Sequence, residues 1–330
     1  MFSVNEWDHL KTVIVSRAND STIPFLDPSL RLTYYAHIKN VKHIKTGPLP
    51  SQVIEETNED LEKLVSFLHS ERCSVYRTDP VWKPKFTNFR PRDNAFVYDK
   101  LALIPPMPVQ IRREEYYSIS GLIEQYIPFV KAPMKNGTYD MYNAKVLEDH
   151  HTTGLFNKIP LFDGSNILRA NDDLFYLVSN TANLMGADYL QSLLPDKRVH
   201  VISNLKTHNH IHNTIIFLRE GLMLVNPNHI QHKEQLPTAL HSWDMIQCPK
   251  PEECYTIEGY PDLYNYYNMD LLVVHPNLVV LEENQISLQR ELEKYNIFAM
   301  MLPLRHIKTL GGGFRSVTLD LIRKQNGDQS

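Results

Sequence analysis

The feature that most constrains the fold is a unit of paired apolar runs that recurs along the chain. Each pair consists of two short β-prone runs separated by a polar turn, which is typical of a β-hairpin. A helical pattern and one more apolar run follow each pair. The hairpins are expected at residues 95–104, 166–178, 214–225 and 271–281. Units spaced roughly 45 to 60 residues apart predict a repeated ββαβ building block in an α/β protein, rather than a parallel doubly wound sheet.

Other segments continue this alternation of strands and helices. The clearest helix is expected from Ser51 to Glu71, because leucines and a valine recur at i, i+3, i+4 and i+7 and form one apolar stripe. Further helices are expected near residues 112–126, 187–194, 232–240 and 286–295, and further strands near 12–16, 74–76, 129–130, 199–202 and 298–301. The polar and aromatic stretch 18–48 is interpreted as a surface excursion, and 135–158 shows no assignable pattern. No linker-like composition interrupts the chain, so residues 1–330 are predicted to form one domain.

Composition and charge exclude several classes of function. Hydrophobic residues make up 42% of the chain and charged residues 22%, with a net charge of −4. Basic residues are too dispersed for nucleic-acid or membrane-surface binding, and the Arg112-Arg113 pair is interpreted as solvated helix surface. The N-terminus lacks a signal-peptide pattern, and no apolar run reaches the roughly 18 residues of a membrane span. Cys73, Cys248 and Cys254 fit no common zinc spacing. These features predict a cytoplasmic protein with reduced thiols.

A triple glycine near the C-terminus predicts a tightly wrapped loop. The chain holds only 12 glycines in 330 residues, yet Gly311, Gly312 and Gly313 are consecutive and stand just before a short β-prone run. Glycine tolerates positive φ and the close approach of another backbone, so the loop is expected to enclose something small. Ser316 would present the next side chain to that space. A loop without chemistry is the alternative interpretation.

Polar residues stand where three of the repeated units begin. Arg92 and Asp93 precede one hairpin, Asp163 precedes the next, and His210 and His212 precede the third. A ring of such units would bring these positions together at its axis, beside the serine that follows the glycine loop. A carboxylate beside an imidazole, near a nucleophilic side chain on a glycine loop, is the arrangement used for acyl- or amidino-group transfer.

Two other interpretations apply to the same residues. On a strand, His208, His210 and His212 would share one face, and such a face can bind Zn²⁺ or a similar ion. No strong fourth ligand is evident, so no metal is assigned. Arg92 and Asp93 could equally form a surface ion pair, which contributes little to stability.

Four segments, in the right order, resemble the amidinotransferases, a family that includes the glycine and inosamine-phosphate amidinotransferases. Residues 5–15, NEWDHLKTVIV, are similar to the family's NEWDPLEEVIV, and residues 162–169, FDGSNILR, resemble FDAANVLR. Residues 210–214, HIHNT, resemble HVDST or HIDAT, and residues 310–320 resemble LGGGFHCATLD. Each match is weak alone, but the set spans nearly the whole chain. The resemblance implies a five-bladed α/β propeller with a pseudo-fivefold axis.

The resemblance also implies a reaction and a role for individual residues. The family moves an amidino group from arginine to an amine through a covalent intermediate. Asp163 and His210 match the family's acid and general base, Ser316 falls at its nucleophile, and Asp93 matches a carboxylate that binds the planar guanidinium. The expected substrate-binding set is completed by Arg92, His212, His229, Gly312 and Gly313. No cofactor is implied. The expected partners are a guanidine donor and an amine acceptor, with a homodimer as the family's usual assembly.

Several positions depart from the family pattern. The nucleophilic cysteine falls at Ser316, whose hydroxyl needs a base to be competent. The second guanidinium-binding aspartate falls at His212, which removes one negative charge, and the arginine that binds the donor's carboxylate falls at His229. Hydroxyl residues of the acceptor region fall at Leu263 and Tyr264. An engineered substitution and natural divergence both account for the serine, and the histidines at 212 and 229 favour divergence.

Three hypotheses follow from the sequence. The first is an amidinotransferase that uses arginine or a related guanidine as donor. The second is a hydrolase of a guanidine or amide, with Ser316, His210 and Asp163 as a triad. The third is a protein that binds a guanidine-bearing small molecule without turning it over. The motif set ranks them in that order.

Overall fold

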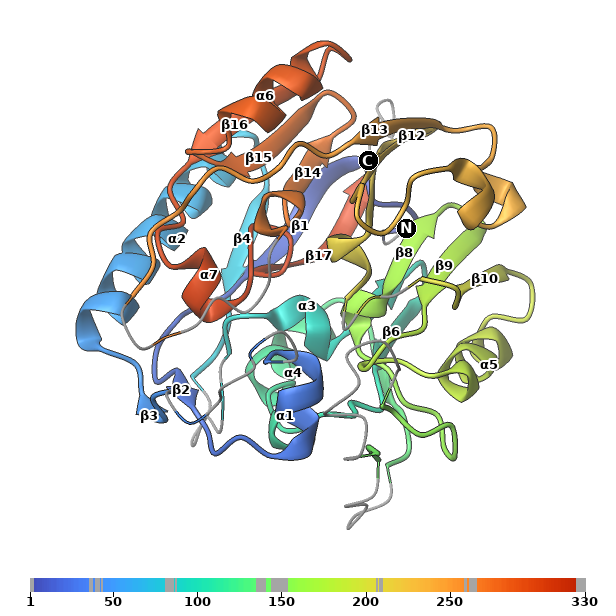
Figure 1. Ribbon diagram of the computed structural model, residues 1–330, viewed down its shortest axis with the longest axis horizontal. Helices are drawn as coiled ribbons and strands as arrows, with labels where there is room; N and C mark the ends of the chain where they lie inside the picture. The colour runs from blue at the N-terminus through green and yellow to red at the C-terminus, as the bar shows by residue number, and fades with distance from the viewer. Residues whose placement is uncertain are drawn as a thin grey trace.

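The computed structural model describes residues 3–35, 38, 42, 44–80, 86, 88–134, 141–143, 154–205, 207, 210–257, 260 and 266–324. Within these residues the strands form five three-stranded sheets and one two-stranded sheet, and helices lie beside them (Figure 1). No helix in the described ranges is long and apolar enough to cross a membrane.

Each three-stranded sheet has the same pairing: two strands pair antiparallel, and a third strand pairs in parallel with one of them. The strands, grouped by sheet, are β5 (Phe96–Tyr98), β6 (Leu101–Ile104) and β7 (Phe129–Lys131); β8 (Ile167–Ala170), β9 (Asp173–Leu177) and β10 (Arg198–Ile202); β11 (Ile215–Arg219), β12 (Leu222–Val225) and β13 (Asp244–Gln247); β14 (Leu272–His275), β15 (Leu278–Glu282) and β16 (Phe298–Leu302); and β17 (Thr318–Lys324), β1 (His9–Val15) and β4 (Ser74–Arg77). The four hairpins expected from the sequence are present.

The fifth sheet joins the two ends of the chain. Its antiparallel pair consists of β17 and β1, with Val13 opposite Asp320 and Val15 opposite Thr318. The third strand, β4, then pairs with β1 in parallel. Because β17 begins two residues after Ser316, this pairing anchors the C-terminal end of the glycine loop to the N-terminal segment.

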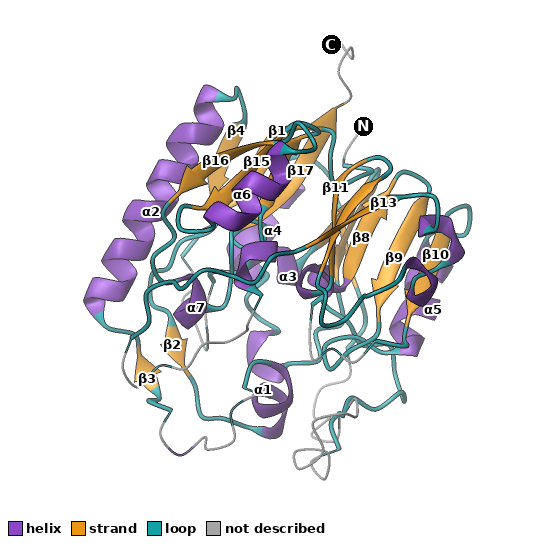
Figure 2. Cartoon of the chain, turned by 45° about the horizontal axis from the view of Figure 1, so that its top comes forward, coloured by secondary structure: helices purple, strands orange, loops and turns teal. Residues whose placement is uncertain are grey.

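In four of these sheets a helix precedes the third, parallel strand in the chain: α2 (Ser51–Ser70), α4 (Tyr117–Glu124), α5 (Leu184–Leu193) and α6 (Ile286–Glu293). Figure 2 shows α2 and α5 on the outer side of the strands. The helix expected at 112–126 is shorter than predicted, and a separate 3₁₀ turn, η2 (Gln110–Arg112), precedes it. The remaining short elements are α1 (Pro28–Thr33), β2 (Thr22–Ile23), β3 (Gly47–Pro48), α3 (Pro91–Asn94), η4 (Gly164–Asn166), η5 (Ile211–Asn213), η8 (Tyr267–Met269) and α7 (Ile307–Leu310).

The prediction of a helix over 232–240 is wrong. Two 3₁₀ turns, η6 (Lys233–Gln235) and η7 (Thr238–Leu240), stand there instead, separated by Leu236 and Pro237. Proline has no N–H to donate, and it disfavours helical torsions at the residue before it. Leu236 is accordingly extended, with φ −103° and ψ 162°.

The stretch interpreted as a surface excursion contributes to the core. Leu30 and Tyr34, at α1 and its C-terminal end, are buried in a cluster that also contains Leu61 and Leu64 of α2. A side chain from this segment also reaches the polar centre of the protein, because the Tyr34 hydroxyl hydrogen-bonds Arg112. Aromatic residues without periodicity therefore pack here against partners far away in the sequence.

Candidate active site

A buried aspartate–histidine pair forms the centre of the site. Asp163 precedes η4, and its Oδ1 accepts a hydrogen bond from the Ser165 backbone N–H at 3.1 Å, so the turn fixes the carboxylate. The other oxygen, Oδ2, lies 2.8 Å from Nε2 of His210, which precedes η5. Both side chains are buried. The sequence had placed these two residues at the starts of successive units, and the structure brings them into direct contact.

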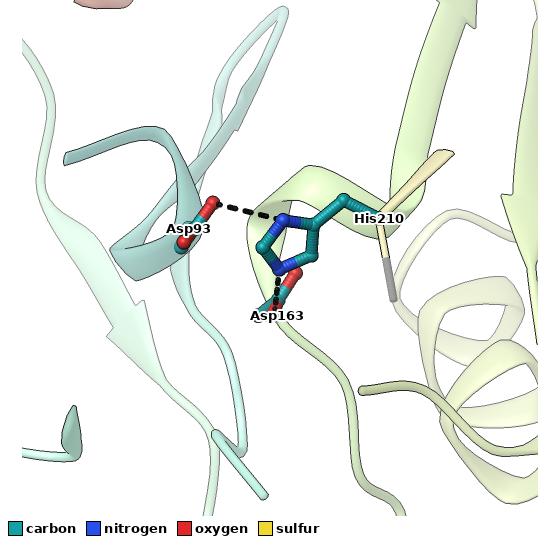
Figure 3. A group of neighbouring side chains, drawn as sticks. All are labelled: Asp93, Asp163 and His210. Carbon is teal, nitrogen blue, oxygen red and sulfur yellow. Dashed lines mark hydrogen bonds and ion pairs between the residues drawn. The ribbon is translucent and has the colours of Figure 1, made fainter. Parts of the chain in front are cut away.

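Asp93 approaches the same imidazole from the opposite side (Figure 3). It is carried by α3, which Figure 1 places between α7 and β8, and its Oδ1 lies 3.9 Å from Nδ1 of His210. The same oxygen accepts a hydrogen bond from the Ser165 hydroxyl. Asp93 is fully buried, so the interpretation of a surface ion pair with its neighbour Arg92 is wrong. The histidine therefore lies between two carboxylates.

The second oxygen of Asp93 holds a guanidinium group from the chain itself. Nη1 of Arg112 lies 2.6 Å from Asp93 Oδ2, and Nε of Arg90 lies 3.8 Å from it. Arg112 also forms an ion pair with Glu115, with Nη2 at 2.8 Å from Oε2. The interpretation of Arg112 as solvated surface is wrong. A dipeptide of two arginines is ambiguous in sequence, and here η2 directs the first of them into the interior.

The charges of this cluster set the protonation of its members. Burial by itself lowers the pKa of His210, but the carboxylates of Asp163 and Asp93 outweigh it and raise the pKa above its ordinary value. Burial raises the pKa of Asp163, although its hydrogen bond to His210 opposes the shift. Burial acts the same way on Asp93, but His210, Arg112 and Arg90 overcome it and hold its pKa below the usual range. The two carboxylates therefore favour the protonated form of His210 more than water favours that of a free imidazole.

The triple glycine lies in a tight loop, as predicted, and the close neighbours of the loop are side chains and backbone of the protein itself. Gly311 ends α7 in the left-handed conformation, with φ 63°. At Gly313 the backbone passes so close to Asp270 that an added Cβ would lie 2.7 Å from the Cβ of that aspartate. A Cβ on Gly312 would lie 3.0 Å from Cγ of Arg90. The small residues are needed because the loop packs directly against the polar cluster.

Asp270 organises this loop, and sequence reasoning did not identify it. Its Oδ1 accepts a hydrogen bond from the Ser316 N–H at 3.0 Å, and its Oδ2 accepts one from the Gly313 N–H at 2.5 Å. Both Asp270 and Ser316 are buried. Asp270 precedes β14 just as Asp93 and Asp163 precede their hairpins. The pattern of an aspartate at the start of a unit would have found it.

The two histidines that depart from the family pattern have different surroundings. Nε2 of His212 lies 3.6 Å from Oδ2 of Asp270, and the ring is 5.4 Å from that of His210, centroid to centroid. Burial lowers the pKa of His212 to about 3, although Asp270 opposes the shift, so the ring is neutral at ordinary pH. His229 is only partly buried, and its Nδ1 lies 3.0 Å from the Thr214 hydroxyl.

Comparison with known proteins places this geometry in a family. Inosamine-phosphate amidinotransferase 1 from Streptomyces griseus is 33% identical over 336 residues, which cover 97% of this chain and 96% of that protein. The chain belongs to the amidinotransferase family. Mitochondrial glycine amidinotransferase from Gallus gallus is 28% identical, over 98% of this chain and 82% of its own length. The solved structure of inosamine-phosphate amidinotransferase StrB1 from Streptomyces griseus superposes with a TM-score of 0.91 at 32% identity, covering 100% of this chain and 98% of that one. No family model matches the chain.

A metal centre is less compatible with this amidinotransferase site than an acid–base pair. Ligand atoms of Asp93, Asp163 and His210 all lie within 4.8 Å of one another, which is close enough to surround an ion. However, His210 already bonds Asp163, and Arg112 supplies a positive charge to Asp93. A divalent cation would have to displace that guanidinium. Of the three histidines first considered as ligands, His208 lies outside the described residues.

Arg92 lies in a different cluster from the carboxylate of its neighbour. Its Nε donates to the backbone carbonyls of Arg315 at 3.0 Å and Thr318 at 3.1 Å, and its Nη2 lies 2.6 Å from Asp320. The side chain therefore holds the start of β17 against α3. This geometry supports a structural role behind the loop, rather than contact with a substrate. The acceptor positions Leu263 and Tyr264 lie outside the described residues.

Proposed function

We propose that the protein transfers an amidino group from a guanidino compound, such as arginine, to an amine, with the covalent step at residue 316. The observation that carries this proposal is the buried Asp163–His210 pair, 2.8 Å apart, in a chain that belongs to the amidinotransferase family. The family supports amidino chemistry on guanidino compounds. The identity of donor and acceptor, and the competence of serine as nucleophile, are parts of the proposal.

The proposed reaction has two steps. The side chain of residue 316 loses its proton to His210 and attacks the guanidinium carbon of the donor, and the carbon–nitrogen bond to the donor's amine breaks. His210 gives its proton to that leaving amine, and Asp163 holds the ring in position. An acceptor amine then attacks the amidino carbon and loses a proton to His210, which returns it to the side chain of residue 316 as the bond between that side chain and the amidino carbon breaks. Arginine would yield ornithine.

In this scheme Gly312 and Gly313 let the backbone of the loop approach the substrate closely. Asp93 and His212 belong to the same group of buried polar side chains. Asp93 is a ready guanidinium ligand, since it already binds the guanidinium of Arg112 at 2.6 Å. His229 hydrogen-bonds the hydroxyl of Thr214, the residue that follows η5. It is proposed to face the carboxylate end of the donor, away from the guanidinium. The repeat of five sheets with one topology supports closure into a five-bladed propeller with a pseudo-fivefold axis. A single cytoplasmic domain that assembles as a homodimer remains a prediction.

The hydrolase hypothesis receives less support from the geometry. A serine triad needs a hydrogen bond between the hydroxyl and one imidazole nitrogen, while the carboxylate holds the other. Here no hydrogen bond joins Ser316 Oγ to His210 in the described part of the chain, and the second nitrogen faces Asp93 at 3.9 Å. The hypothesis of a non-catalytic binding protein is favoured by one observation, namely that the buried Ser316 hydroxyl has no hydrogen-bond partner among the described residues.

The test is incubation of the protein and of its Ser316→Cys variant with arginine and a panel of small amines, followed by measurement of ornithine. The cysteine variant is expected to release ornithine in an acceptor-dependent way and to gain the mass of one amidino group when the acceptor is withheld. Ser316→Ala is the matched control and should do neither. Ammonia release without an acceptor would support the hydrolase. If guanidines bind calorimetrically and neither form turns over, the binding-protein hypothesis replaces the enzyme.

A further inference from the structure

Behind the Ser316 loop lies a second buried cluster that the proposed reaction does not use. It contains four arginines and two carboxylates, all nearly inaccessible to solvent: Arg92, Arg169, Arg315, Arg323, Glu6 and Asp320. Most of its members are well paired. For example, Nε of Arg169 lies 2.9 Å from Glu6, and Nε of Arg323 lies 2.7 Å from Asp320.

Arg315 is the exception within this cluster. Its Nη2 makes a long hydrogen bond of 3.4 Å to the Ile167 carbonyl and lies 3.8 Å from Glu6. Its Nε and Nη1 have no hydrogen-bond partner, although the residue is only 4% exposed. Burial and the adjacent charge of Arg92 lower the pKa of Arg315 to about 10, against the opposing effect of Glu6 and Asp270. Two of the three guanidinium nitrogens of Arg315 therefore lack an acceptor, and its nearest ion-pair partner is 3.8 Å away.

A small cavity adjoins these groups. Its volume is about 10 Å³, and its lining includes Glu6, Arg92, Arg315 and Arg323 together with apolar side chains such as Phe217. A volume of this order holds roughly one water-sized species. Larger anions such as sulfate or a substrate carboxylate do not fit.

The balance of charge decides what kind of species suits the cavity. Among the described residues, the carboxylates in ion pairs with the four arginines are Glu6 and Asp320, and Asp270 also acts on Arg315. Four guanidinium groups thus face three carboxylates, and one positive charge is uncompensated. A water molecule would supply an acceptor but would leave this charge unpaired, whereas a monovalent anion supplies both.

We propose that this cavity binds one monovalent anion of about halide size, held by Nε and Nη1 of Arg315 with Arg92 and Arg323 beside it. The anion would stabilise the glycine loop on the side away from Asp163 and His210. The Arg315 carbonyl already accepts a hydrogen bond from Arg92, and the next residue is Ser316. The site is independent of which reaction the protein performs. It stands on burial, charge and cavity size alone.

Thermal unfolding tests the site in solution. The midpoint should rise saturably when sodium chloride or bromide replaces sodium gluconate at constant ionic strength, since a ligand that binds only the folded state stabilises it. Arg315→Gln should lose this increment. Arg198→Gln, in an exposed ion pair with Asp173, is the matched control and should keep it. A midpoint that is the same in chloride and gluconate overturns the proposal.

Diffraction locates the ion and remains decisive if Arg315→Gln fails to fold. Crystals of the unmodified protein soaked in bromide should give an anomalous difference peak at the bromine edge in contact with the Arg315 guanidinium. A peak at that position confirms the site. A water molecule there, or bromide only on the surface, overturns the proposal even if chloride raises the unfolding midpoint.

Discussion

Asp93 binds the guanidinium of Arg112, with Nη1 2.6 Å from Oδ2, in the position where the resemblance to the amidinotransferases predicts that a guanidino substrate is held. Tyr34 and Glu115 fix the same arginine on its other sides. The carboxylate therefore meets its geometric requirement within the chain itself. A substrate guanidinium must share Asp93 with Arg112 or take its place.

Arg112→Ala should make the carboxylate of Asp93 available to free guanidinium ion. Breaking a buried pair leaves a charge uncompensated, so the free energy of unfolding should fall by about 3 to 5 kcal/mol. Low, non-denaturing concentrations of guanidinium chloride should restore part of this loss, measured by thermal unfolding against sodium chloride. Arg198→Ala removes an exposed pair instead and should lose under about 1 kcal/mol, with no rescue. Rescue of both variants, or of neither, would contradict this assignment.

Asp163→Asn should lower the pKa of His210. Burial lowers the pKa of His210, whereas the Asp163 and Asp93 carboxylates raise it. Removal of one carboxylate therefore leaves the effect of burial less opposed, and the pKa falls. Because the leaving amine needs a protonated His210, the alkaline limb of the activity profile should move to lower pH. Turnover in whichever form of residue 316 is active should fall by about 10²- to 10⁴-fold. Histidine titration by NMR gives the pKa directly, and an unchanged value would rule out this role for Asp163.

His212 should make the protein less stable in mild acid. The folded-state pKa of about 3 lies below the ordinary 6.5, so the unfolded state binds the proton first and stability falls as pH drops below that value. At pH 5 the preference of the unfolded state for this proton lowers the free energy of unfolding by about 2 kcal/mol. His210 shifts in the opposite direction, so the comparison must be made between the parent and His212→Asn. Denaturant unfolding at pH 7 and pH 5 should show a smaller loss in the variant, and equal losses would refute the assignment.

Gly313→Ala should disrupt the loop that carries Ser316. The added methyl would lie 2.7 Å from Cβ of Asp270 and would also overlap its backbone carbonyl oxygen. The backbone cannot move away without disturbing the residues next to it. We expect a loss of about 1 to 3 kcal/mol in unfolding free energy, and faster amide exchange at residues 313 and 316. Gly121→Ala, in α4 with no atom near the new methyl, is the matched control and should be neutral or stabilising by up to about 1 kcal/mol. Equal effects of both changes would show that the contact with Asp270 is unimportant.

Local sequence pattern accounts for most of the secondary structure. The apolar stripe of residues 51–71 became α2, and each of the four expected hairpins formed, because period and turn residues act within a few positions. The failure at 232–240 has an equally local cause, since Pro237 was present in the sequence and should have limited the helix. The site was anticipated in part for a different reason. Asp163 and His210 stand at equivalent positions of repeated units, and the structure joins them.

The sequence by itself determined the repeated unit, the glycine loop and the residues at the start of each unit. Only the tertiary structure decided that β17 and β1 complete a fifth sheet, that Arg112 turns inward to Asp93, and that Asp270 holds the Ser316 backbone. These contacts join residues far apart in the chain, between 19 and more than 300 positions away. A buried charge finds its partner through packing rather than through sequence spacing, so no pattern of neighbours encodes the pairing.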